Sequence, residues 1–359
     1  MAIDEMLKIA PFSLKAEAKA EIFKAEMDRL NALHYEACLP FRRIVDALDI
    51  DLRSITKLEE MPFLPVSVFK ELRLLSVPEE EVVKTITSSG TSGQAVSRIF
   101  LDKTTAANQQ KVLVKIVNDF IGGRRLPMLI IDSPSVIKDR AAFSARGAGI
   151  IGFSIFSSDR AYALNEAMEL DFEAIETFLA KHQGRDILVF GFTFMIWQHF
   201  QKALAASGRY VDLSRARLIH GGGWKKLISE SVSPQQFAEA LHQVCGISHI
   251  HDYYGMAEQT GGIYMQCEAG HLHASIFSAI MMRDPVDFSI VPDGSPGIIQ
   301  VMSVIARSYP GHSLLTEDEG LILGRDDCPC GRLGAYFKVL GRIKNAEIRG
   351  CSDTYAAEY

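Results

Sequence analysis

The chain has 359 residues, a length that suggests about two to three domains. Its 38 basic and 44 acidic residues give a net charge of −6, which argues against a protein that coats nucleic acid or a lipid surface. Hydrophobic residues at 48% and charged residues at 23% are ordinary globular values and exclude wholesale disorder.

The beginning of the chain, MAIDEMLKIAPFSLK, lacks the basic and apolar regions of a signal peptide. The most apolar runs fall short of the ~18–20 residues that span a bilayer. We therefore expect a cytoplasmic protein with no membrane insertion and no nucleic-acid partner. In that compartment the six cysteines are expected to be thiols or metal ligands rather than a disulfide framework.

Residues 1–82 are predicted to be a mainly helical N-terminal segment. Apolar residues recur at helical spacing over 13–35, and a second helical stretch covers roughly 37–49. Ser13 and Glu17 form a loose N-terminal capping signal for the first of these helices.

Residues 83–261 are predicted to form an α/β core. Short apolar strands alternate with helical patterns, which indicates layers of helix and sheet. The predicted strands are Val82–Thr87, Val96–Leu101, Met128–Asp132 and Ile187–Phe190, and the predicted helices are 104–121, 161–181, 194–206 and 233–244. Residues 262–340 alternate short β-like runs with glycines and are predicted to be a β-rich subdomain, followed by a hinge and tail over 341–359.

A loop of small and hydroxylated residues joins the first two predicted strands. It offers many backbone N–H groups, and its glycines allow close approach of an anion. No Lys-Ser/Thr pair follows, so the loop is not a Walker loop, and a plain hairpin remains the alternative. The loop consists of Thr87, Ser88, Ser89, Gly90, Thr91, Ser92 and Gly93.

Two further motifs contain glycines, and the first follows a short apolar run, Ala216–His220. Gly221, Gly222 and Gly223 remove side chains from one wall, as a flat ligand such as a purine requires, and Lys225 and Lys226 follow them. A tight turn with a solvated basic pair is the alternative.

The second of these motifs is Tyr-Tyr-Gly-Met-Ala-Glu, which contains Tyr254, Gly255 and Glu258. A carboxylate opposite a phosphate loop is a usual means of holding Mg²⁺. His220, His249 and His251 lie near the two motifs and are given no role.

Cysteines and histidines with metal-ligand spacing occur in the β-rich part. Cys267 precedes His271 and His273, and Cys328 and Cys330 share one short turn further along the chain. Thiolates and imidazole are the ligands that zinc prefers in a closed structural site. We predict Zn²⁺ bound by Cys267, His273, Cys328 and Cys330, with His271 as a substitute for His273. Buried free cysteines and surface histidines are the alternative.

The order of these motifs resembles the adenylate-forming superfamily of acyl-CoA synthetases, luciferases and nonribosomal adenylation domains. The motifs are TSSGTSG at 87–93, YGMAE at 254–258, TED at 316–318 and GR at 341–342. Within the superfamily the chain looks most like LuxE-like acyl-protein synthetases, and phenylacetate-CoA ligase is the nearest broader relative. The resemblance covers about residues 40–350 and implies the large N-terminal α/β domain of that superfamily, with layered sheets and a smaller β-rich subdomain.

The resemblance implies a role for each matched residue. Thr87–Gly93 would cradle the ATP phosphates, and Gly221–Gly223 would line the adenine. Tyr254 would stack near the adenine, next to Gly255. Glu258 would ligate Mg²⁺. The preceding Ala257 stands where many members have threonine, so one hydroxyl contact is missing.

Further roles fall on the C-terminal motifs. Asp318 would bind the ribose hydroxyls, and Arg342 at the hinge would contact ribose or phosphate. Independently of the resemblance, we expect Lys225 or Lys226, which follow the glycine run, to neutralise the carboxylate or the α-phosphate. Larger members carry a C-terminal lid domain, which is expected to be missing because the chain stops at Tyr359. Cys351 matches by position the cysteine near the C-terminus that carries the acyl group in LuxE-like proteins.

The predicted function is therefore ATP-dependent activation of a carboxylic acid, most simply a fatty acid, to an acyl-adenylate, followed by thioester formation on Cys351. The thioester would be consumed by an acyl reductase or transferase partner, and a homo-oligomer remains open. One alternative is an acyl-CoA or aryl-CoA ligase that uses CoA as the thiol. Another is a non-catalytic scaffold or sensor with an adenylate-like fold, which pyrophosphate exchange would distinguish from both enzymes.

Overall fold

The computed structural model describes residues 3–88, 96–137, 145–224 and 230–343. These residues form two compact bodies. The first body comprises the described residues up to 119 and those from 255 onward, and the second body comprises those from 120 to 254. Residues 83–261, which the sequence groups as one core, thus contribute to both bodies. Within the described residues no helix is long and apolar enough to cross a membrane.

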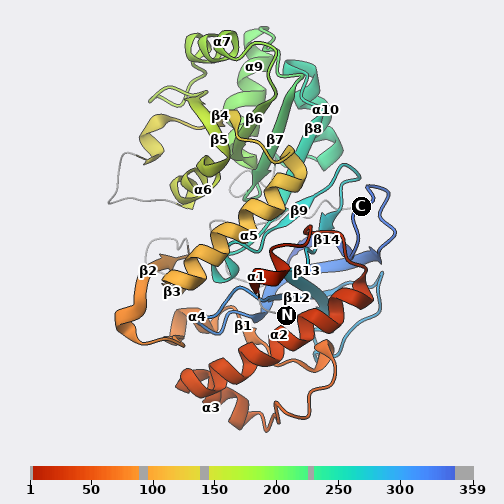
Figure 1. Cartoon of the computed structure of the whole chain (residues 1–359). Coiled ribbons are helices and arrows are strands. Elements are labelled where there is room, and N and C mark those ends of the chain that lie inside the picture. Colours follow the sequence, from red (N-terminus) through yellow and green to blue (C-terminus); the bar gives the residue numbers. More distant parts are fainter. Residues whose placement is uncertain (1–2, 89–95, 138–144, 225–229, 344–359) are drawn as a thin grey trace. The chain divides into compact units, whose positions relative to one another are not determined.

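The first body is built on an antiparallel sheet with the strand order β11-β12-β13-β14-β10-β9, and β1 pairs in parallel with β13 (Figure 1). A separate hairpin pairs β2 with β3. The strands are β1 (Leu64–Pro65), β2 (Val82–Thr87), β3 (Arg98–Asp102), β9 (Tyr264–Gln266), β10 (Leu272–His273), β11 (Ser278–Arg283), β12 (Gly297–Ser303), β13 (Ser313–Arg325) and β14 (Ala335–Arg342).

Helices from the N-terminal part pack in the same body. They are α1 (Ile3–Met6), α2 (Ala16–Ala37), α3 (Leu39–Ala47), α4 (Val68–Glu71) and all but the end of α5 (Lys103–Ile121). One face of α2 is buried through Phe23, Met27 and Leu30. His34, on the same helix, is buried and makes two hydrogen bonds. Its Nε2 donates to the carbonyl oxygen of Ala306 at 3.0 Å, because a carbonyl can only accept. Its Nδ1 therefore accepts from the hydroxyl of Ser76 at 2.7 Å.

The second body is a parallel sheet with the strand order β8-β7-β6-β4-β5 (Figure 1). Its strands are β4 (Leu126–Ile131), β5 (Ser157–Tyr162), β6 (Ile187–Phe192), β7 (Ala216–Gly221) and β8 (His249–Tyr254). Every residue of β4 and β6 is buried, as expected for strands covered on both faces.

Helices cover both faces of this parallel sheet. They are α6 (Ala145–Phe153), α7 (Phe172–Lys181), α8 (Thr193–Met195), α9 (Lys202–Ser207) and α10 (Pro234–Cys245), with a π-helical segment at Ile196–Gln201. One face forms a core with α7 and α10, in which Trp197 stacks on Phe237 at a centroid distance of 5.9 Å. On the other face Phe153 of α6 stacks on Phe190 at 4.4 Å. Ligands of α/β proteins usually bind at the carboxyl ends of the parallel strands, so this edge of the sheet is a candidate binding site.

Two local predictions are wrong. The helix predicted over 161–181 begins only at Phe172, because Leu164 pairs with Leu170 in a β-bridge and the side chain of Asp171 caps the helix by accepting from Ala174 N at 2.9 Å. The capping signal at Ser13 is also not used. Helix α2 begins at Ala16, whose N–H donates to the carboxylate of Asp326 at 3.0 Å.

Candidate functional site

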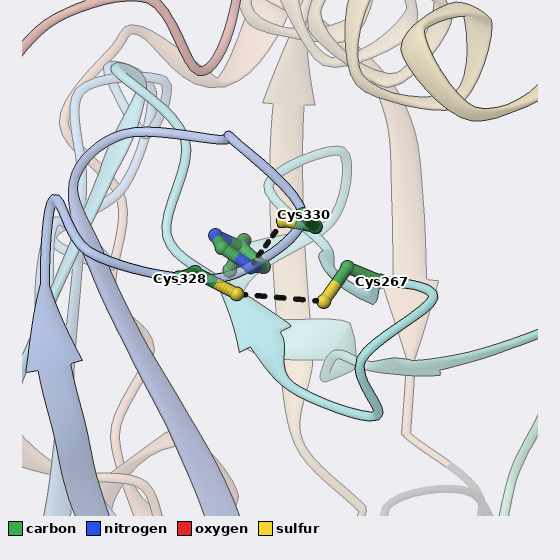
Figure 2. Close-up of side chains that lie close together, drawn as sticks. Cys267, Cys328 and Cys330 are labelled. Carbon is green, nitrogen blue, oxygen red and sulfur yellow. Dashed lines mark hydrogen bonds between the residues drawn. The ribbon is translucent and has the colours of Figure 1, made fainter.

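The cysteines and histidines predicted to bind zinc lie together in the first body. Cys267 directly follows β9 and His273 ends β10, whereas Cys328 and Cys330 lie on the turn between β13 and β14. Because β10 pairs with both β9 and β14, the sheet brings these two stretches of the chain to one place. Figure 2 shows the side chains of Cys267, Cys328 and Cys330 pointing toward one another.

The ligand atoms of the cluster have the spacing of a tetrahedral metal site. The sulfur and nitrogen atoms of Cys267, His273, Cys328 and Cys330 all lie within 4.8 Å of one another. A zinc tetrahedron with bonds of about 2.3 Å to sulfur and 2.0 Å to nitrogen has S–S edges of about 3.8 Å and S–N edges of about 3.5 Å. The observed Cys267–Cys328 distance is 3.8 Å, and Cys330 Sγ lies 3.4 Å from His273 Nε2. The donor set therefore fits Zn²⁺.

Burial also changes the protonation of the residues in the cluster. Burial raises the pKa of the Cys267 thiol and raises that of Cys328 to about 12, whereas burial lowers the pKa of His273 to about 4. The histidine is thus neutral at neutral pH, as a ligand must be, and a divalent cation would convert the thiols to thiolates. His271 lies outside the four-residue cluster but is close to it, with Nδ1 3.3 Å from Cys328 Sγ and its ring stacked on Tyr336.

The predicted magnesium ligand Glu258 is also in the first body. It lies on a short 3-10 helix, Ala257–Gln259, and its side chain is buried. The hydroxyl of Tyr309 donates to the backbone carbonyl of Glu258 at 2.8 Å, and the side-chain amide of Gln259 donates to Gly311 O at 2.8 Å. These bonds hold the turn and place a carboxylate, the oxygen ligand that Mg²⁺ prefers, at a fixed position.

Asp318 and Arg342 lie opposite each other on paired strands. They are partners in the β13–β14 register, and Arg342 Nε lies 3.9 Å from Asp318 Oδ1. The guanidinium of Arg342 also pairs with Glu317 at 2.9 Å. Asp318 is buried, and its N–H donates to the hydroxyl of Thr316 at 3.1 Å. The TED and GR motifs, which are separated in sequence, thus form one cluster.

The phosphate loop is described only at its base. Thr87 ends β2, and Ser88 closes the hairpin by accepting on its hydroxyl from Ser97 N at 2.9 Å. The remaining predicted loop residues, Ser89, Gly90, Thr91, Ser92 and Gly93, lie outside the described residues. Lys225, Lys226 and Cys351 do so as well.

In the second body the glycine run lies at the carboxyl edge of the parallel sheet. A Cβ atom on Gly221 would lie 2.7 Å from the ring of Tyr253, and one on Gly222 would lie 2.7 Å from Phe192. Gly222 also has φ +80°, a conformation that favours glycine. Packing against these aromatic rings is therefore sufficient to explain why positions 221 and 222 are glycine. Tyr254, the predicted adenine neighbour, is 1% exposed, whereas Tyr253 faces the glycines.

A polar pair at the same edge was missed by the sequence analysis. Asp132 directly follows β4 and is 1% exposed, and its Oδ2 lies 3.2 Å from Nε of Arg146 on α6. Burial raises the pKa of Asp132, and Arg146 opposes this effect. Asp132 could have been identified from the sequence, because it is an acidic residue at the end of an apolar strand. Nothing in the sequence pointed to its partner.

His220 takes part in a second polar contact of this edge. Its Nδ1 lies 3.0 Å from the hydroxyl of Thr193, which follows β6. Burial lowers the pKa of His220 to about 3, so the ring is neutral at neutral pH. The contact orients an uncharged imidazole beside the glycine run.

Comparison with known proteins gives a consistent result. The family described as "Acyl-protein synthetase, LuxE" matches residues 1–359. A long-chain-fatty-acid–luciferin-component ligase of Vibrio harveyi is 25% identical over 338 residues, which cover 89% of this chain and 83% of the relative. The ligase of the same name from Aliivibrio fischeri is 22% identical and covers 82% of this chain and 78% of the relative.

The fold is similar to a solved adenylate-forming enzyme. A 2-hydroxyisobutyryl-CoA ligase, in the postadenylation state with an acyl-AMP, superimposes with a TM-score of 0.70 at 14% sequence identity. The match covers 94% of this chain and 70% of that one. At this identity the likeness establishes the adenylate-forming α/β fold predicted from the sequence.

Proposed function

Because the chain belongs to the acyl-protein synthetase (LuxE) family of AMP-forming ligases, we propose that it activates a long-chain fatty acid with ATP and transfers the acyl group to Cys351. The match of the family over the whole chain carries this proposal. The acid is proposed from the names of the Vibrio and Aliivibrio relatives, and the acceptor from the position of Cys351 in the sequence.

The first chemical step needs charge neutralisation and positioning. A carboxylate attacks the α-phosphorus of ATP and displaces pyrophosphate, which gives an acyl-adenylate. We assign Glu258 to Mg²⁺, Asp318 to the ribose hydroxyls and Arg342 to ribose or phosphate. The buried Glu258 turn and the paired Asp318–Arg342 strands support this assignment because they fix these groups before a ligand arrives.

The remaining nucleotide roles stay with residues predicted from the sequence. Thr87–Gly93 is assigned to the phosphates, with Lys225 to the carboxylate or α-phosphate. Gly221–Gly223, Tyr254 and Gly255 are assigned to adenine, although Tyr254 has little exposed surface. Mg²⁺, when bound, would offset the charge of the phosphates.

The second step moves the acyl group from phosphate to sulfur. The Cys351 thiolate attacks the mixed anhydride, AMP leaves, and a thioester forms on the protein. An acyl reductase or transferase partner would then consume the thioester. We assign Zn²⁺ to Cys267, His273, Cys328 and Cys330 as a structural ion that joins the β9–β10 and β13–β14 turns and takes no part in catalysis.

Pyrophosphate exchange combined with intact-mass spectrometry tests the proposal. With ATP, Mg²⁺ and a panel of carboxylic acids, we expect exchange with a long-chain acid and a matching acyl mass on the wild-type protein. Cys351→Ala should keep the exchange and lose the acyl mass, whereas Cys245→Ala, which changes a buried thiol of the second body, should keep both.

Three results would contradict parts of the proposal. An acyl mass that persists in Cys351→Ala would place the acceptor elsewhere. Exchange that yields acyl-CoA and no acyl-protein would favour a CoA ligase. No exchange with any acid would favour the non-catalytic scaffold or sensor.

Glu258→Gln should lower the exchange rate on the order of 10²-fold, because the metal loses a charged ligand.

A further inference from the structure

A semi-enclosed cavity lies in the first body between helix α2 and the antiparallel sheet. It has a volume of about 150 Å³. Most of its lining residues are apolar, such as Phe23 of α2, Met282 of β11 and Ile322 of β13. Four are charged, namely Lys19, Glu59, Asp293 and Arg325. None of the residues assigned above to the nucleotide or to the metal lines it.

A lysine with a buried side chain lines this cavity. Lys19, on α2, is 7% exposed and lines the cavity. Its Nζ donates to the carbonyl oxygen of Ala274 at 3.2 Å, and within the described residues the amine makes no other hydrogen bond. An ammonium group has three N–H donors, so two remain for a ligand.

The charged groups around the cavity do not neutralise Lys19. At the rim Arg325 forms a bidentate ion pair with Asp293 at 2.7 and 2.9 Å, and Glu59 is exposed. In the described part of the chain no carboxylate lies within ion-pair distance of Lys19 Nζ. Burial, followed by the positive charge of Arg325, lowers the pKa of Lys19 to about 7, and Asp326 opposes this shift. The amine is therefore only partly protonated at neutral pH.

We propose that this cavity binds a small monocarboxylate, with its two oxygens on Lys19 Nζ and its short apolar tail against Phe23, Met282 and Ile322. A cavity of about 150 Å³ holds a molecule the size of benzene, so an acid with a tail of a few carbons fits. An apolar site tolerates a neutral pair of ammonium and carboxylate far better than a lone charge. A phosphate dianion would leave excess negative charge there.

Binding of the acid is coupled to uptake of a proton by Lys19. The carboxylate favours the ammonium form, so each complex takes up a fraction of a proton near neutral pH. Above the pKa of the free amine the affinity should fall by up to about tenfold for each pH unit. The other charged groups near the amine are Arg325, Asp293, Glu59 and Asp326, and the proton that is taken up is assigned to Lys19.

Calorimetric titration with butyrate tests the proposal on the full-length protein. We expect saturable binding of butyrate, and about tenfold weaker binding of butyramide, which has the same shape without the charge. Titrations in buffers of different ionisation enthalpy should show proton uptake. Lys19→Met should weaken butyrate binding by at least about tenfold. The matched control is Lys24→Met on the same helix, where the lysine pairs with Asp28 at 2.8 Å near the surface, and it should bind like the wild type.

A second variant keeps the test decisive if Lys19→Met does not fold. Ala20→Met fills the cavity from the next position of α2 and leaves the amine in place, so it should also abolish binding. Circular dichroism and thermal melting identify the folded variants. Absence of saturable binding through the millimolar range, or equal binding by wild type and the folded cavity variants, would overturn the proposal. Neither result depends on acid activation or on Cys351, so the proposed function is tested separately.

Discussion

The cysteine–histidine cluster of the first body and the glycine edge of the second body are built on opposite principles. The cluster gathers the four side chains that are assigned to zinc on two turns of an antiparallel sheet, with their sulfur and nitrogen atoms within 4.8 Å of one another. The glycine edge gathers backbone against aromatic rings, with Phe192 and Tyr253 filling the space beside Gly222 and Gly221. The first depends on the chemical identity of its residues, and the second depends on their size.

This difference determines what a substitution does in each region. In the cluster a cysteine-to-serine substitution would remove a proposed zinc ligand while the packing stays almost unchanged. In the glycine edge a single methyl group collides with a ring although the chemistry is unaltered. Variants that separate loss of a ligand from loss of space therefore sharpen the comparison.

Metal removal should have the largest effect. Cys328→Ser should lose equimolar zinc and lower the unfolding free energy, because an ion held at about 1,000 times its dissociation constant adds about 4 kcal/mol. Cys38→Ser, which alters another buried thiol of the first body, should keep the zinc. Elemental analysis and urea unfolding measure the two quantities. A purified protein that carries no zinc, and whose melting temperature does not respond to zinc or chelator, would refute the metal centre.

Gly222→Ala should have the next largest effect. The substitution places a Cβ 2.7 Å from Phe192 at a residue with φ +80°. Overpacking and the left-handed backbone together should cost about 2–4 kcal/mol. Gly208→Ala is the matched control, because Gly208 has φ +66° but nothing within 4 Å of the added methyl, so only about 1 kcal/mol should be lost. Equal unfolding free energies for the two variants would show that space is not limiting at the glycine edge.

Acid should destabilise both bodies through buried neutral histidines. Burial lowers the pKa of His34 in the first body and of His220 in the second to about 3. The unfolded chain therefore binds more protons than the folded one between about pH 6.5 and pH 3, and stability falls as the pH falls through that window. Each histidine should lower the unfolding free energy by up to about 1.4 kcal/mol for each pH unit within that window.

Urea unfolding at a series of pH values measures this dependence. His34→Gln should flatten the slope, because glutamine can accept from Ser76 and donate to Ala306 without titrating. The control, His242→Gln, changes an exposed residue and should leave the slope unchanged. A slope that is the same in the wild type and His34→Gln would exclude His34 as its source.

Much of the fold could be predicted because local patterns agree with tertiary structure. The strand predicted at Val82–Thr87 is confirmed with the same bounds, and the helix predicted over 104–121 is confirmed as α5. The helix predicted over 233–244 is confirmed as α10, where Ser233 and Gln236 form a capping box and Gly246 ends the helix. For α10 these start and stop signals lie directly beside the helix in the sequence.

Predictions failed where a distant residue decides the local structure. Helix α2 begins at Ala16 because Asp326, far along the chain, accepts its N–H. The pair of Asp132 and Arg146 was missed for the same reason, since only the fold brings α6 to the end of β4. The metal ligands could be proposed from sequence because few roles suit two cysteines on one turn. The glycines could be noticed, but the rings that require them could not be identified.

The cap of α7 should have the smallest effect. Asp171→Ala removes the side chain that accepts from Ala174 N at 2.9 Å and should cost about 1 kcal/mol. Glu173→Ala, at an exposed position in the same first turn, keeps the cap and should lose only the weaker interaction with the helix dipole, about 0.3 kcal/mol. Urea unfolding compares the variants, and hydrogen exchange of the first α7 amides locates the change. If Asp171→Ala is no less stable than Glu173→Ala, then packing rather than the cap sets the start of α7. Side-chain packing would then determine the start of α7, as it determines the residues at the glycine edge of the same body.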